Sequence, residues 1–155
     1  MRIPFFLVAF ASACASSTVQ ADMWSPSGNW QMSGWAMVSK GLTAQCPMTI
    51  DFAVPSPGST ASATPSFFGP HCFFFMERPY LAELQPDGTT LTLHDVVMVG
   101  ISSGGCSGDL SGQWDNVAKT LTIDTIVPTD TPGTDDCFIQ AVLTLNSPSA
   151  GSIVP

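Results

Sequence analysis

The stretch YLAELQPDGTTLTLH, residues 80–94, decides the fold class of this chain. Its centre, Pro86-Asp87-Gly88, is typical of a tight turn, because proline presets φ and glycine accepts a positive φ. A short β-like run lies on each side of the turn, over residues 80–85 and 89–94. Two such runs joined by a tight turn predict a β-hairpin.

Alternating apolar residues extend this pattern in both directions along the chain. Residues 47–54 place Met48, Ile50, Phe52 and Val54 at alternate positions, as in a half-buried strand. No convincing amphipathic helix appears after the N-terminal segment. The other predicted strands cover residues 29–39, with a bulge or kink at Gly34, and residues 72–76, 96–101, 110–114, 120–127 and 139–145. About eight short strands without crossover helices predict an all-β fold, either a single antiparallel β-sandwich or a meandering barrel.

The two ends of the chain and one irregular stretch complete the predicted organisation. Residues 1–21 have the form of a secretory signal peptide: Arg2, a short apolar run and an exit ending at Ala21. We expect cleavage there and one β-domain over residues 22–155, with a Pro/Ser-rich loop at 55–65 and a frayed tail from about residue 147. The predicted location is extracellular. In the alternative, Cys14 lies in a lipobox-like Ala-Ser-Ala-Cys segment and anchors the protein to the cell surface through a lipid.

Composition excludes several classes of partner. The chain has 4 Lys+Arg against 12 Asp+Glu and a formal net charge of −8. Phosphate binding requires clustered basic residues, so nucleic acid is not an expected partner, and neither is an anionic membrane surface. After the predicted signal peptide, no run of residues is long and apolar enough to predict a membrane span. Hydrophobic residues make up 45% of the chain and charged residues 10%, which argues against disorder.

Four cysteines remain after the predicted signal: Cys46, Cys72, Cys106 and Cys137. An even set of cysteines in an exported chain indicates disulfides rather than catalysis or metal binding. Four cysteines allow three pairings. We favour Cys46–Cys72 with Cys106–Cys137. The second pair has the better argument, since a strand, a tight turn and a returning strand bring the chain back to the end where Cys106 lies.

Three motifs have the residues for chemistry but not the expected context. Residues 100–104 match Gly-x-Ser-x-Gly, but another strand follows in place of the helix that a nucleophile elbow needs. His71 and His94 lack close ligand spacing for a metal. Asp130, Asp135 and Asp136 lack the regular spacing of a calcium loop. We therefore expect no enzyme activity, no cofactor and no metal site.

Phenylalanines around Cys72 are the strongest functional candidates. Side chains alternate between the faces of a strand, so three consecutive phenylalanines cannot all enter one core. One interpretation is a strand covered on both faces. The other is an exposed patch that contacts oil, an interface or another subunit. The predicted patch contains Phe67, Phe68, Phe73, Phe74 and Phe75.

Several ordered segments resemble a known family. Residues 39–46 read SKGLTAQC, residues 106–116 read CSGDLSGQWDN, and residues 137–145 begin at the last cysteine. Together with Cys72, this order is similar to the bacterial alkane oxidation activator proteins of the Pra type. The chain departs from the family at the phenylalanine run and at Arg78-Pro79-Tyr80, where the family has a Trp-Pro element.

The resemblance implies an exported, non-enzymatic protein that promotes growth on long-chain alkanes by improving access to the insoluble substrate. It implies no catalytic residues. Two alternatives stay open from the sequence. One is a cell-surface or biofilm-matrix protein that assembles through β edges. The other is a lipocalin-like carrier or a protease inhibitor, because Gly28-Asn29-Trp30 and Gly112-Gln113-Trp114 share the Gly-x-Trp pattern of such barrels.

Overall fold

The fold is a closed antiparallel β-barrel in a computed structural model that describes residues 23–56, 58–70, 72, 74–76, 78–100 and 104–154. Within these ranges no residue is helical. The predicted signal peptide lies outside them and remains a prediction. The strands are β1 (Met23–Ser25), β2 (Gly28–Lys40), β3 (Leu42–Val54), β4 (Thr60–Phe67), β5 (Phe74–Phe75), β6 (Tyr80–Leu84), β7 (Thr90–Gly100), β8 (Gly105–Asp115), β9 (Thr120–Val127), β10 (Cys137–Ser147) and β11 (Ser152–Val154).

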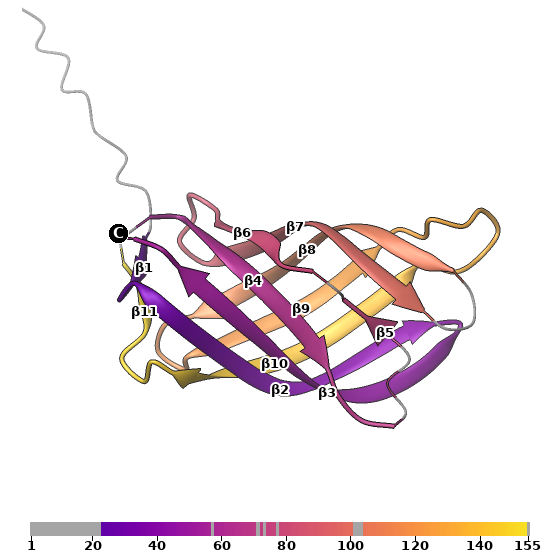
Figure 1. Ribbon diagram of the computed structural model, residues 1–155, viewed down its shortest axis with the longest axis horizontal. Coiled ribbons are helices and arrows are strands. Elements are labelled where there is room, and N and C mark those ends of the chain that lie inside the picture. The colour runs from indigo at the N-terminus through magenta and orange to yellow at the C-terminus, as the bar shows by residue number, and fades with distance from the viewer. Residues whose placement is uncertain are drawn as a thin grey trace, which may run out of the picture.

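The barrel strands follow one another as a meander. β2, β3, β4, β6, β7, β8, β9 and β10 pair in this order, and β10 pairs with β2 to close the ring (Figure 1). Both β5 and β6 pair with β7. β6 pairs with residues 91–93, and β5 pairs with residues 99–100 at the other end of β7. The all-β prediction is therefore confirmed, and of the two predicted architectures the molecule adopts the barrel.

Alternating side chains fill the barrel interior. Along β2, Trp30, Met32, Ala36 and Val38 are buried, while the residues between them face outward or are partly exposed. Burying a large apolar side chain contributes about 1.5–3 kcal/mol, so the interior is the main source of stability. The largest fully buried side chains are Trp24, Trp30, Phe52, Met32, Met48, Ile50, Leu91, Leu93, Met98, Leu110, Leu121 and Ile123.

A two-stranded sheet caps one end of the barrel. β1 and β11 pair there, opposite the end that holds the β2–β3 turn and the β9–β10 loop (Figure 1). Trp24 of β1 is 1% exposed, and its ring lies 4.9 Å from the ring of Trp30 and 5.1 Å from that of Phe52. Residues 152–154, part of the predicted frayed tail, are thus held as β11. The prediction failed because Ile153, 4% exposed, belongs to a very short apolar pair at the end of a stretch rich in small and polar residues.

The predicted loop at 55–65 is wrong in its second half, which belongs to β4. Ala61 and Ala63 are 4% and 0% exposed and point into the barrel, whereas Thr60 and Ser62 point outward. Alanine is depleted in strands, so the alternation of alanine with hydroxyl residues gave only a weak strand signal. Pairing with β3 and β6 on its two sides imposes the strand.

Gly34 permits close packing between β2 and β10. The register of β2 with both neighbours passes through Gly34 without a shift, so the predicted bulge is absent from β2. A Cβ at position 34 would collide with the carbonyl oxygen of Val142. An irregularity does occur in β7: its register with β8 shifts between Leu93 and Val96, and Asp95 has φ of 52°.

Both predicted disulfides are confirmed. Cys46 pairs with Cys72, with 5.6 Å between their Cα atoms, and Cys106 pairs with Cys137, with 6.1 Å between theirs. The first joins β3 to the segment before β5. The second joins β8 to β10 across β9, at the end of the barrel opposite the cap.

Candidate functional site

One side of the barrel carries very little charge. The outward positions of β10, β2, β3 and β4 include a single charged residue, Asp51, and all of these positions lie in the described part of the chain. We call this surface the low-charge face. Its outward residues are Phe138, Gln140, Val142, Thr144 and Asn146 on β10; Asn29, Gln31, Ser33, Trp35, Met37 and Ser39 on β2; Thr43, Gln45, Pro47, Thr49, Asp51 and Ala53 on β3; and Thr60, Ser62, Thr64 and Ser66 on β4.

An apolar row crosses the low-charge face from β10 to the end of β4. Val142 pairs with Trp35, and Trp35 pairs with Pro47. Phe68 continues the row, because its backbone N–H donates to the Pro47 carbonyl at 2.9 Å. Trp35, Val142 and Phe68 are 66%, 54% and 53% exposed. Neighbouring strands lie about 4.8 Å apart, so the apolar row is about 14 Å long.

A hollow of about 400 Å³ lies beside the apolar row. Trp35, Val142, Met37, Gln45 and Gln140 are among its lining residues. Met37 pairs with Gln140 on one side and with Gln45 on the other, so the two amide side chains flank it. The hollow therefore combines an aromatic ring with polar groups on two sides.

Among the side chains that the structure describes, Phe68 is the member of the predicted phenylalanine patch that lies on this surface. Phe67 is partly buried and packs against the core. Phe74 and Phe75 form β5, and their side chains, like the whole of Phe73, lie outside the described parts.

The prediction missed Trp35, Pro47 and Val142. The sequence contains a signal for Trp35. It lies an odd number of residues from the inward Trp30 and Met32, and side chains alternate along a strand, so Trp35 is expected to point outward.

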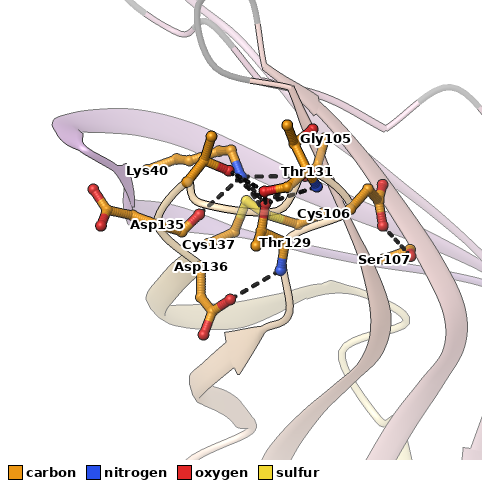
Figure 2. Close-up of a disulfide and its surroundings, with 11 residues drawn as sticks. Lys40, Gly105, Cys106, Ser107, Thr129, Thr131, Asp135, Asp136 and Cys137 are labelled. Atoms are coloured by element: carbon orange, nitrogen blue, oxygen red, sulfur yellow. Dashed lines mark hydrogen bonds between the residues drawn. A yellow bond between two sulfur atoms is a disulfide. The ribbon is translucent and has the colours of Figure 1, made fainter.

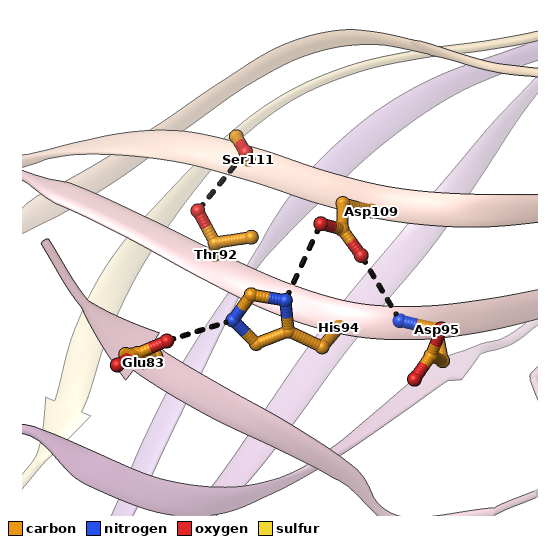
Figure 3. Close-up of polar contacts among 6 residues, drawn as sticks. All are labelled: Glu83, Thr92, His94, Asp95, Asp109 and Ser111. Carbon is orange, nitrogen blue, oxygen red and sulfur yellow. Dashed lines mark hydrogen bonds and ion pairs between the residues drawn. The ribbon is translucent and has the colours of Figure 1, made fainter.

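Charged side chains gather on the other half of the barrel. His94 on β7 lies between two carboxylates, with Nε2 3.0 Å from Glu83 Oε2 on β6 and Nδ1 3.3 Å from Asp109 Oδ2 on β8 (Figure 3). Asp109 Oδ1 also accepts a hydrogen bond from the backbone N–H of Asp95. The two ring nitrogens contact different carboxylates on different strands, so this group ties three strands together at the β7 irregularity. His71 and residues 101–103 lie outside the described ranges.

Lys40 anchors the barrel end near the second disulfide. It is 4% exposed, and its ammonium donates to the Gly105 carbonyl at 3.2 Å, to Thr129 Oγ1 at 2.7 Å and to the Asp135 carbonyl at 2.8 Å (Figure 2). Three donors thus meet three oxygens. Nζ also lies 3.3 Å from Cys106 Sγ. The SKGLT motif is therefore structural: it forms the β2–β3 turn, with φ of 73° at Gly41.

The aspartates of the β9–β10 loop have separate hydrogen-bond roles. Asp136 Oδ1 accepts from the Thr129 N–H at 2.9 Å (Figure 2). Asp130 Oδ1 accepts from Ser107 Oγ. Asp135 contributes its backbone carbonyl to Lys40. Within the described residues, no group of three or more His, Cys, Asp or Glu side chains has the arrangement of a metal site.

Comparison with models of known protein families gives a match over the whole chain. A family model described as alkane oxidation protein activator PraA/PraB-like matches residues 1–155. No curated protein and no solved structure matches the chain. Among the described residues there is no helix of sufficient length and apolar character to cross a membrane.

Proposed function

Because the chain belongs to the PraA/PraB-like family of alkane oxidation protein activators, we propose that it is an exported, non-enzymatic accessory protein that attaches to the surface of long-chain alkanes. In this proposal the low-charge face contacts the hydrocarbon and makes it accessible to the cell. The two disulfides support export, since such bonds persist in oxidising compartments.

The apolar row is the observation that carries the proposal. An alkane surface offers no hydrogen bonds, so any charged group placed against it loses its hydration without compensation. The low-charge face avoids that cost and presents Trp35 and Phe68. If each ring covers a further ~100 Å² on contact, the gain is about 2.5 kcal/mol per ring.

The two halves of the barrel would orient the protein at the interface. Glu83, His94 and Asp109 lie on β6, β7 and β8, away from the apolar row. These groups remain hydrated when the opposite half rests on oil. A closed barrel can therefore act at an interface without unfolding.

Two features of the barrel weigh against the alternatives. Each of its eight strands pairs on both sides for at least part of its length within the described residues, so no barrel strand offers a whole free edge for assembly. In the interior, where a carrier would hold its ligand, this barrel holds Trp30, Phe52, Met48 and Trp114.

The test is binding of the purified protein to hexadecane droplets. We expect a Trp35→Ser/Phe68→Ser variant to bind at least about tenfold more weakly, because it removes both rings from the apolar row. Val117→Ser is the control, since Val117 is 94% exposed but lies in the β8–β9 turn. Equal binding by the folded double variant and the wild type would contradict the proposal.

Growth connects this binding to the cell. A strain without the protein should grow more slowly on hexadecane than the wild type and at the same rate on glucose. The wild-type gene and the Val117→Ser gene should restore growth on hexadecane, and the double variant should not. A growth defect on both carbon sources would indicate a general surface role instead.

A further inference from the structure

We infer that the hollow beside Trp35 is a binding site for an uncharged sugar ring of a polysaccharide. This inference concerns a ligand other than alkane. It depends on side chains next to the apolar row, not on the family to which the chain belongs.

The hollow has the two kinds of surface that a pyranose ring needs. Trp35 is 66% exposed, so the face of its indole is available. Sugar C–H groups carry partial positive charge, because each carbon bears an oxygen, and they pack on the negative face of an aromatic ring. A binding site of this kind combines such an apolar surface with a few placed polar groups.

Gln45 and Gln140 supply the polar groups. They flank Met37 in the row of residues next to Trp35. Strand spacing places their backbones about 10 Å apart, and the row that they share with Met37 lies two residues, or about 7 Å, along the strand direction from Trp35. A ring resting on Trp35 and Met37 therefore has an amide at either edge to meet its hydroxyl groups.

Both amides are available for a ligand. Gln31 and Gln113, elsewhere on the barrel surface, donate to Asp51 and Thr90. Within the described residues, neither Gln45 nor Gln140 has such a hydrogen-bond partner, and both are exposed. Each amide offers two donors and one acceptor oxygen, which suits hydroxyl groups that both donate and accept.

Charge near the hollow selects a neutral sugar. Asp124 on β9 pairs directly with Gln140, so a carboxylate stands at the edge of the site. This carboxylate can accept a hydrogen bond from a hydroxyl group of the sugar. Both the carboxylate and the net charge of −8 repel the negative charge of a uronic acid. An alkane would be a poorer occupant here, because it would bury both amides without hydrogen bonds.

The test measures binding of neutral hexasaccharides of glucose, mannose and galactose, with a hexamer of galacturonic acid for comparison. Indole fluorescence and calorimetry on the full protein give the affinities. We expect at least one neutral hexamer to bind and the acidic hexamer not to bind. Absence of binding by all neutral hexamers, or equal binding of the acidic one, overturns the inference.

Matched variants separate sugar binding from alkane binding. Gln45→Ala/Gln140→Ala should weaken sugar binding at least about tenfold and should not weaken hexadecane binding, because it leaves the apolar row intact and removes two amides that oil cannot hydrogen-bond. Phe68→Ser should weaken hexadecane binding and leave sugar binding unchanged. Sugar binding that survives in the double glutamine variant overturns the inference, whereas hexadecane binding that survives in Phe68→Ser counts against the proposed function only.

Discussion

The side-chain amide of Asn116 pairs with the backbone of Ile153 as one strand pairs with another. Asn116 Nδ2 donates to the Ile153 carbonyl at 2.6 Å, and Asn116 Oδ1 accepts from the Ile153 N–H at 2.9 Å. Trp114 Nε1 donates to the same Oδ1 at 2.7 Å. The Trp-x-Asn turn therefore attaches the β1–β11 cap to the barrel.

Replacement of Asn116 by Asp should loosen this cap. The carboxylate can accept from Ile153, but it places an oxygen against the Ile153 carbonyl where Asn116 has a donor. We expect a loss of about 1–3 kcal/mol in the free energy of unfolding, measured by urea denaturation. Hydrogen exchange at Ile153 should become faster. Asn146→Asp is the control, because Asn146 makes an exposed contact with Ser33, and its effect should stay within about 0.5 kcal/mol.

Lys40→Met should destabilise the opposite end of the barrel. Methionine keeps most of the length but removes the ammonium that donates to the oxygens of Gly105, Thr129 and Asp135. We expect a loss of about 3 kcal/mol. Lys119→Met removes the same charge from a turn and serves as the control. An equal effect of the two substitutions would show that net charge, rather than the buried contacts, is responsible.

The Cys106–Cys137 disulfide should stabilise the folded protein by about 3–4 kcal/mol, given its sequence separation of 31 residues. The Cys106→Ala/Cys137→Ala variant also removes a neighbour of the Lys40 ammonium. Combined with Lys40→Met, its effect should therefore not be additive. A double-mutant cycle in urea measures the coupling, and strict additivity would indicate that the two features act independently.

Acid should weaken the turn between β6 and β7. Hydrogen bonds from the Thr90 hydroxyl and from the N–H groups of Thr90 and Thr89 lower the pKa of Asp87 from 3.8 to about 2. Because the folded pKa lies below the unfolded one, the stabilisation is present above pH 3.8 and is lost as the pH falls through about 2. Thr90→Val should raise the pKa of Asp87, as measured by carboxyl NMR. An unchanged titration would rule out the hydroxyl contact.

Gly34→Ala should be strongly destabilising for so small a change. The added methyl group would meet the Val142 carbonyl, which cannot move without breaking the β2–β10 pairing. We expect a loss of about 2 kcal/mol or more in thermal or urea unfolding. Ser33→Ala, one position earlier on the outer surface, should change stability by less than about 0.5 kcal/mol. A neutral Gly34→Ala substitution would show that β10 can shift at this point.

Local patterns predicted much of the fold. Turn residues located the β6–β7 hairpin, alternation located β3 and β10, and cysteine positions gave both disulfides. Barrel closure was beyond reach because it depends on a pairing between distant strands. β4 was missed in part because alanines, rather than large apolar residues, face its interior.

The candidate site was harder to predict than the fold. Clustering of phenylalanines in sequence pointed to residues 67–75, but the apolar row is assembled across strands. Trp35, Pro47 and Val142 are distant in sequence and meet only through the register of β10, β2 and β3. From the sequence alone, Lys40 would likewise be expected on the surface of a turn. The tertiary structure instead places three acceptor oxygens around its ammonium.

Closure of the meander through β10 and β2 also has a consequence for folding. Hairpins between consecutive strands have short loops to close, whereas the β2–β10 pairing joins distant parts of the chain, so on topological grounds we expect it to form last. Until it forms, β2 and β10 are the two open edges of a sheet, with unpaired backbone groups. Those edges carry Trp35 and Val142. Exchange of an edge between two unclosed chains is therefore the misfolding route to which this topology is most exposed.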